Sequence, residues 1–107
     1  MNKETVLIEG GKCASKAEMY IDALQVCPQE LQKSYRFLIV KTIVTEAISY
    51  WARTRNGATL FSDTLLEYEE VYKWVLSDMV SRGCMFYPDP SQYKLLLHEY
   101  GKILLSL

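Results

Sequence analysis

The side chains best suited to nucleophilic or acid–base catalysis are few in this sequence. His98 is its single histidine, which excludes sites built from paired histidines and leaves one base for any catalytic relay. The three cysteines, Cys13, Cys27 and Cys84, are widely spaced and form no C-x-x-C pair, so neither a zinc site nor a disulfide framework is indicated. A cysteine nucleophile with His98 as its base is the one enzymatic mechanism left open. We expect no catalytic residue, no metal and no cofactor.

A glycine pair before a lysine, at residues 10–12, is also found at the end of phosphate-binding loops. Those loops need a further glycine where Val6 stands and a hydroxyl side chain where Cys13 stands, so the pattern fails. The carboxylates of residues 67–78 fall on one predicted helix, where solvation is their ordinary role, and none of them forms an evident catalytic pair. Nucleotide binding and acid–base catalysis are therefore not predicted.

Length and composition indicate one globular domain covering residues 1–107. Half of the residues are apolar and 23% are charged, which is typical of globular proteins. No apolar run approaches the roughly 18 residues of a membrane span, and the N-terminus lacks a signal-peptide core. With 12 basic and 13 acidic residues, the overall charge does not favour nucleic acid or an anionic membrane. We expect a cytoplasmic protein.

Capping and periodicity predict an all-α fold, a compact bundle of about four helices with a short N-terminal arm. The helices are expected at about 16–26, 35–55 and 63–82, and from Pro90 to the C-terminus. The second of these is a central core helix that the others surround. Lys33 and Arg36 would project into its apolar arc, which predicts a break near Ser34.

Residues 1–14 are expected to form the arm. They carry one short β-like run, Val6-Leu7-Ile8, followed by Gly10-Gly11, and such a run cannot make a stable sheet without a partner strand. Two interpretations remain open: a frayed terminus, or an arm that docks on another subunit.

Trp74 is the first candidate for a contact with a partner protein. Helical spacing places it opposite the apolar stripe of the third helix, on a face that carries Glu67, Glu70 and Asp78. The tryptophan either packs under the first helix or serves as an exposed anchor for a partner, and tryptophan is enriched among interface hot spots. We predict these four residues as a partner-binding surface.

A second candidate surface lies on the last helix, where Leu95, His98, Lys102 and Leu105 recur on the side opposite the core stripe. A monomer gains nothing by exposing two leucines, so this row predicts a helix-to-helix contact such as a homodimer interface.

The charges differ between the two central helices. Residues 28–57 hold five basic and two acidic residues, a net +3, and residues 58–83 hold two basic and five acidic, a net −3. The two helices therefore attract each other, or else the basic residues meet an acidic partner or nucleic acid. The basic residues are Lys33, Arg36, Lys41, Arg53 and Arg55.

These features favour a non-enzymatic protein-binding regulator, of the inhibitor, anti-activator, adaptor or chaperone type, that acts through a helical surface as a homodimer. A nucleic-acid-associated regulatory protein is the alternative, with the basic residues of the second helix contacting phosphates.

Overall fold

The computed structural model describes residues 1–26, 28–54, 61–83 and 92–105, without the side chains of residues 29, 92 and 100–105. The described residues contain no strand and form the helices α1 (Lys3–Val26), α2 (Gln29–Thr54), α3 (Phe61–Ser81) and α4 (Gln92–Leu105). The predicted all-α bundle of four helices is confirmed. Within the described part of the chain, no helix combines the length and the apolar character needed to cross a membrane.

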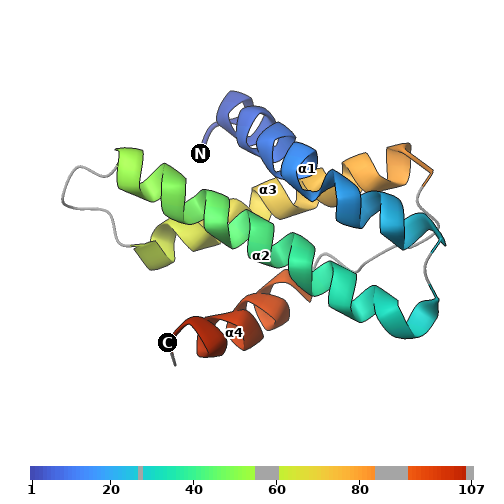
Figure 1. The fold of residues 1–107 in the computed structure, drawn as a ribbon. Helices are drawn as coiled ribbons and strands as arrows, with labels where there is room; N and C mark the ends of the chain where they lie inside the picture. Colours follow the sequence, from blue (N-terminus) through green and yellow to red (C-terminus); the bar gives the residue numbers. More distant parts are fainter. Residues whose placement is uncertain (27, 55–60, 84–91, 106–107) are drawn as a thin grey trace.

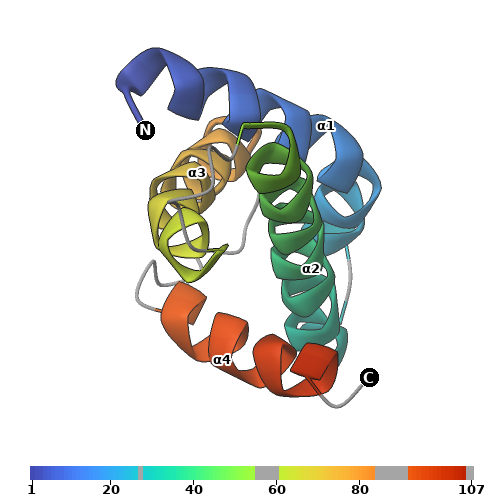
Figure 2. The same cartoon turned by 90° about the vertical axis from the view of Figure 1, so that its left-hand side faces the viewer.

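The crossed helices α2 and α3 form the middle of the molecule. Figure 2 shows α1 on one side of this pair and α4 on the other. In the described residues α1 and α4 make no contact with each other, whereas both of them contact α2 and α3. All the other helices therefore touch the long α2, as predicted for the central segment, and they touch α3 as well.

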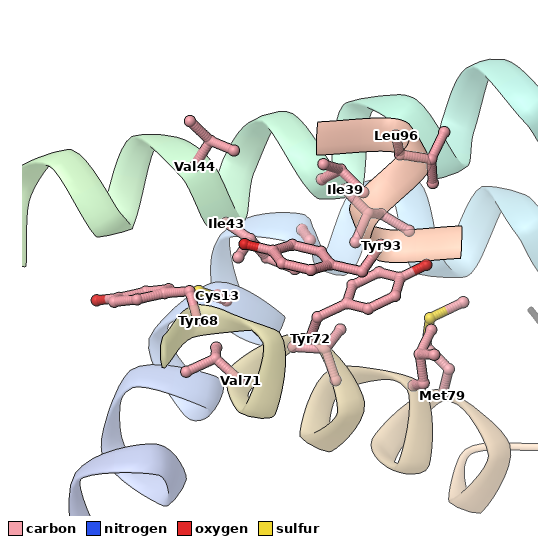
Figure 3. Packing of buried hydrophobic residues seen from close by; sticks show 14 of the residues in the cluster. Cys13, Ile39, Ile43, Val44, Tyr68, Val71, Tyr72, Met79, Tyr93 and Leu96 are labelled. Carbon is pink, nitrogen blue, oxygen red and sulfur yellow. The ribbon is translucent and has the colours of Figure 1, made fainter. Parts of the chain in front are cut away.

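The core lies where α1, α2 and α3 meet and extends to the start of α4 (Figure 3). The stripe predicted for the third helix is confirmed, because Tyr68, Val71, Tyr72, Val75 and Met79 are at most 1% exposed. Toward α4, the rings of Tyr72 and Tyr93 stack with centroids 4.9 Å apart, which adds an aromatic contact to the area they bury.

The N-terminal segment is helical, so the prediction of an arm over residues 1–14 and of a helix start at 16 was wrong. Asn2 caps the helix, because its side-chain oxygen accepts a hydrogen bond from the Thr5 amide at 2.8 Å. The helix then continues through Gly10 and Gly11, and Gly10 is buried against α3. Gly10, the first residue of the glycine pair, is thus a point of close contact between α1 and α3.

The predicted break near Ser34 was also wrong, because α2 runs unbroken from Gln29 to Thr54. Arg36 is half-buried beside Tyr72 and Met79, and Lys33 lies at the edge of a groove next to α4. Long basic side chains can cover apolar surface with their methylene groups and keep their charge near solvent, so the helix tolerates both.

The predicted C-terminal ends of the first and third helices, at about 26 and 82, agree with the structure to within one residue. Gly83 has φ of 77° and its amide bonds the carbonyl oxygen of Val80 at 3.0 Å, which is the glycine stop expected after α3. The predicted stop at Asn56-Gly57, the apolar segment at 84–88 and the helix start at Pro90 lie outside the described residues.

Candidate functional site

The row predicted as a dimer interface begins on an exposed face of α4. Leu95 is 60% exposed and His98 is exposed, whereas Tyr93 and Leu96 of the same helix are buried. The structure therefore brings Leu95 and His98 together on the solvent side of α4. The side chains of Lys102 and Leu105, which complete the row, lie outside the described part of the chain.

A groove of about 350 Å³ separates α4 from the first half of α2. Its floor is apolar, because Phe37 and Leu38 of α2 face Leu96 of α4 across it. Lys33 and Glu99 stand at its edges, and Leu95 borders the adjoining hollow. The larger groove is within the size range that binding sites use, and the exposed leucine of the predicted dimer row borders a smaller hollow of about 130 Å³ beside it.

Trp74 packs on α1. A Cβ built on Gly10 would lie 2.7 Å from Cε3 of the indole, so the ring lies directly on the glycine backbone. The ring is half-buried and belongs to the core contacts. The structure thus has the first of the two arrangements considered for this tryptophan, the one in which it packs under the first helix.

The acidic residues predicted to accompany Trp74 are paired within the chain. Glu67 lies 3.4 Å from the Met1 ammonium group and Glu70 lies 3.2 Å from the Lys73 ammonium group. Asp78 binds Arg82 Nε at 2.9 Å. The acidic face of α3 is in this way largely neutralised by its own molecule, and its role in partner binding stays a prediction.

The basic residues of α2 face different neighbours. Lys33 lines the groove next to α4, Arg36 lies beside the core residues of α3, and Lys41 lines a groove next to α1. Arg53 is exposed and its Nε bonds the Ser49 carbonyl oxygen at 3.2 Å, and Arg55 lies outside the described residues. The four basic residues that the structure describes do not lie on one face that could follow a phosphate backbone.

A buried polar cluster between α1, α2 and α3 was not predicted. Glu9 is 3% exposed and accepts a hydrogen bond from the Tyr68 hydroxyl at 2.9 Å. Glu46 falls in the polar half of α2 by helical spacing, yet it is 4% exposed and binds the Lys16 ammonium group. The exposed side chain of Lys12 places its ammonium nitrogen 3.2 Å from Glu9 Oε1. Both buried carboxylates therefore have a cation, as buried charges require.

This cluster fixes the position of α1. Tyr68 joins three helices, since its hydroxyl donates to Glu9 of α1 and lies 3.4 Å from the Glu46 carbonyl oxygen of α2. Burial, followed by the hydrogen bond to Glu9, raises the pKa of the Tyr68 hydroxyl, which stays protonated and able to donate. A sequence signal existed, because the apolar stripe Ala17, Ile21, Leu24 continues backward through Cys13 and Glu9 at helical spacing.

The thiol of Cys13 is fully buried beside the cluster and is unsuited to nucleophilic attack. Burial, followed by the negative charges of Glu46 and Glu9, raises its pKa from 9.0 to about 12, so the thiol is protonated at neutral pH. His98 lies on α4, on the opposite side of the α2 and α3 pair (Figure 2). The Cys13 version of the cysteine–histidine mechanism is therefore wrong, and Cys27 and Cys84 lie outside the described residues.

Within the described ranges, no three His, Cys, Asp or Glu side chains gather closely enough to hold a metal ion. Comparison of the chain with protein-family models, with curated proteins and with solved structures found no match.

Proposed function

We propose that this chain is a non-enzymatic protein-binding regulator of the inhibitor, anti-activator, adaptor or chaperone type, which acts through a helical surface as a homodimer. The observation that carries the proposal is Leu95, which is 60% exposed on α4 and borders a small hollow between α4 and α2. Burying such a leucine against a second protein removes its apolar surface from water, and this stabilises the contact by about 25 cal/mol per Å².

The dimer is proposed to form through the solvent side of α4, with the row Leu95, His98, Lys102 and Leu105 of one copy against the same row of the other. A two-fold contact uses the same patch on both subunits, which an α4-to-α4 pairing satisfies. The proposed location is the cytoplasm, and a buried, unpaired Cys13 thiol agrees with a reducing compartment.

Sedimentation velocity over a range of protein concentrations tests the dimer. We expect a concentration-dependent dimer that Leu95→Glu weakens at least about tenfold, because a charge on each copy would have to be buried at the contact. Leu66→Glu on α3 is the matched control, since Leu66 is 57% exposed and lies on another helix. A monomer at every concentration, or equal effects of the two variants, would contradict the proposed dimer.

Partner binding is tested by affinity capture from the native host with the full chain and with Leu95→Glu, followed by mass spectrometry. A protein retained by the full chain at stoichiometric level supports a regulator. The same preparations are titrated with duplex DNA at low salt. DNA binding that weakens steeply as salt is added would favour the nucleic-acid alternative instead.

A further inference from the structure

One face of α2 points away from both α1 and α4, and none of the four helices covers it (Figure 1). We call this face the α2 stripe. Its members recur at alternating steps of three and four residues and are Leu31, Ser34, Leu38, Lys41, Thr45 and Ile48. Leu31 is 47% exposed and Ile48 is 42% exposed, so the stripe presents large apolar side chains near both of its ends. Its spacing is that of the contact face of one helix packed along another.

The threonines of this face need no outside hydrogen-bond partner. The Thr45 hydroxyl donates to the Lys41 carbonyl oxygen at 2.8 Å, and the Thr42 hydroxyl beside it donates to the Leu38 carbonyl oxygen at 3.0 Å. Their methyl groups remain as additional apolar surface. Covering these two threonines therefore leaves neither hydroxyl without a hydrogen bond, which is the usual penalty for burying a polar residue.

Leu38 forms a ridge with a hollow on each side. It lines the groove of about 350 Å³ next to α4 and also a groove of about 270 Å³ next to α1. Helices pack by placing the side chains of one into the grooves of another. The ridge and its two flanking grooves fit a partner helix lying along α2 over the roughly 25 Å from Leu31 to Ile48.

Between Leu31 and Ile48 the exposed charges on α2 at or beside the stripe are Lys41 within it and Lys33 at its edge, and Glu30 lies just beyond its N-terminal end. Among the described residues, Lys33 and Lys41 have no ion-pair partner, in contrast to Lys12, Lys16 and Lys73. Glu46, in the groove next to α1, is already bound by Lys16. Glu99 is the one exposed carboxylate that lines the two grooves. A partner helix that carries carboxylates along the edges of its apolar face would pair with the two lysines.

We propose that the α2 stripe binds an acidic amphipathic helix of another protein. The inference rests on the proposed protein-binding function and names the chemistry of the partner. A second copy of the stripe is disfavoured as the occupant, because pairing stripe with stripe opposes the Lys33 and Lys41 charges of two copies. The α4 row is a separate face, so the homodimer and the bound helix do not compete for Leu95.

The test uses a fluorescein-labelled helical peptide of three heptads with leucine at the two seam positions of each heptad and glutamate at the flanking positions. Binding to the full chain is followed by fluorescence anisotropy. We expect saturable binding that weakens several-fold between about 50 and 300 mM salt, since the ion pairs are partly exposed. A peptide with lysine in place of glutamate should bind at least about tenfold more weakly.

Variants locate the site. Lys41→Glu and Ile48→Asn should each weaken binding of the acidic peptide by about tenfold or more. Their controls, Lys73→Glu and Val80→Asn, make the same changes at exposed positions of α3, Val80 being 44% exposed, and should change binding less than about twofold. Circular dichroism and a thermal melt verify that each variant is folded.

The outcomes separate this proposal from the proposed function. No binding of the acidic peptide, equal binding of the lysine peptide, or equal effects of the α2 and α3 variants would overturn it while leaving the α4 homodimer untouched. A homodimer that Ile48→Asn dissociates and Leu95→Glu does not would also overturn it, since the occupant would then be a second copy. Loss of the dimer in Leu95→Glu with unchanged peptide binding supports two independent faces.

Discussion

The indole of Trp74 lies on Gly10 so closely that a Cβ at residue 10 would be 2.7 Å from the ring, whereas a Cβ on the neighbouring Gly11 would meet nothing within 4 Å. Two adjacent helical glycines thus differ in what surrounds them. One is needed for the approach of α1 to α3, and the other has no packing reason to be glycine.

We therefore expect opposite effects of one substitution at the two positions. Gly10→Ala should lower the free energy of unfolding by about 1–2 kcal/mol, because overpacking against a ring outweighs the better helix propensity of alanine. Gly11→Ala should raise it by up to about 1 kcal/mol. Urea denaturation of both variants measures the difference. A stabilising Gly10→Ala would show that the indole does not lie on that glycine.

The Tyr68 hydroxyl supports a buried charge, and the Tyr93 hydroxyl does not. Tyr68→Phe removes the 2.9 Å hydrogen bond to Glu9 and should cost about 1.5–3 kcal/mol, since Lys12 would remain as the one described donor to that carboxylate. Tyr93→Phe removes a 3.0 Å bond to the neutral Leu65 carbonyl oxygen and should cost about 0.5–1.5 kcal/mol. Equal losses in urea denaturation would contradict a charged partner for Tyr68.

The sequence predicts the elements that depend on local signals. The buried face of α3 follows from apolar spacing alone, and the end of α3 follows from Gly83. The helical N-terminus was missed because Gly10 has the same local signature as a stop. What distinguishes it is Trp74, which is 64 positions away in the sequence and adjacent in space.

The polar cluster was missed for a related reason. Glu46 belongs to the polar half of α2 when residues 35–55 are considered by themselves, and burial becomes acceptable once Lys16 of α1 supplies a cation. With residues 1–14 predicted as an arm, Glu9 was not expected to pack against α3. That wrong helix boundary concealed the buried Glu9 carboxylate and its hydrogen bond with Tyr68.

The cap of α1 is a local signal that the sequence contains. Asn2→Ala removes the acceptor of the Thr5 amide and should lower the free energy of unfolding by about 1 kcal/mol, whereas Asn2→Asp should retain the cap and complement the helix dipole. Thermal unfolding compares the two variants, and hydrogen exchange at the Thr5 amide reports the cap directly. Fast exchange at Thr5 in the unmodified chain would contradict a capped helix at residue 3.

Cys13 should make the stability of the fold fall at alkaline pH. Its thiol has a pKa raised from 9.0 to about 12 by burial and by the nearby carboxylates. Above about pH 9 the unfolded chain releases this proton and the folded chain keeps it, so the folded state binds more protons and unfolding becomes more favourable as the pH rises.

The stability advantage of the unmodified chain over Cys13→Ala should accordingly shrink by about 1.4 kcal/mol between pH 8 and pH 10. The comparison with Cys13→Ala removes the contributions of the other cysteines, which both chains share. It likewise removes the loss that Tyr68 and Tyr93, whose pKa values are also raised, add in both chains once unfolded tyrosines ionise. Urea denaturation at closely spaced pH values measures the slope, and a difference independent of pH would show that the thiol is hydrated in the folded protein.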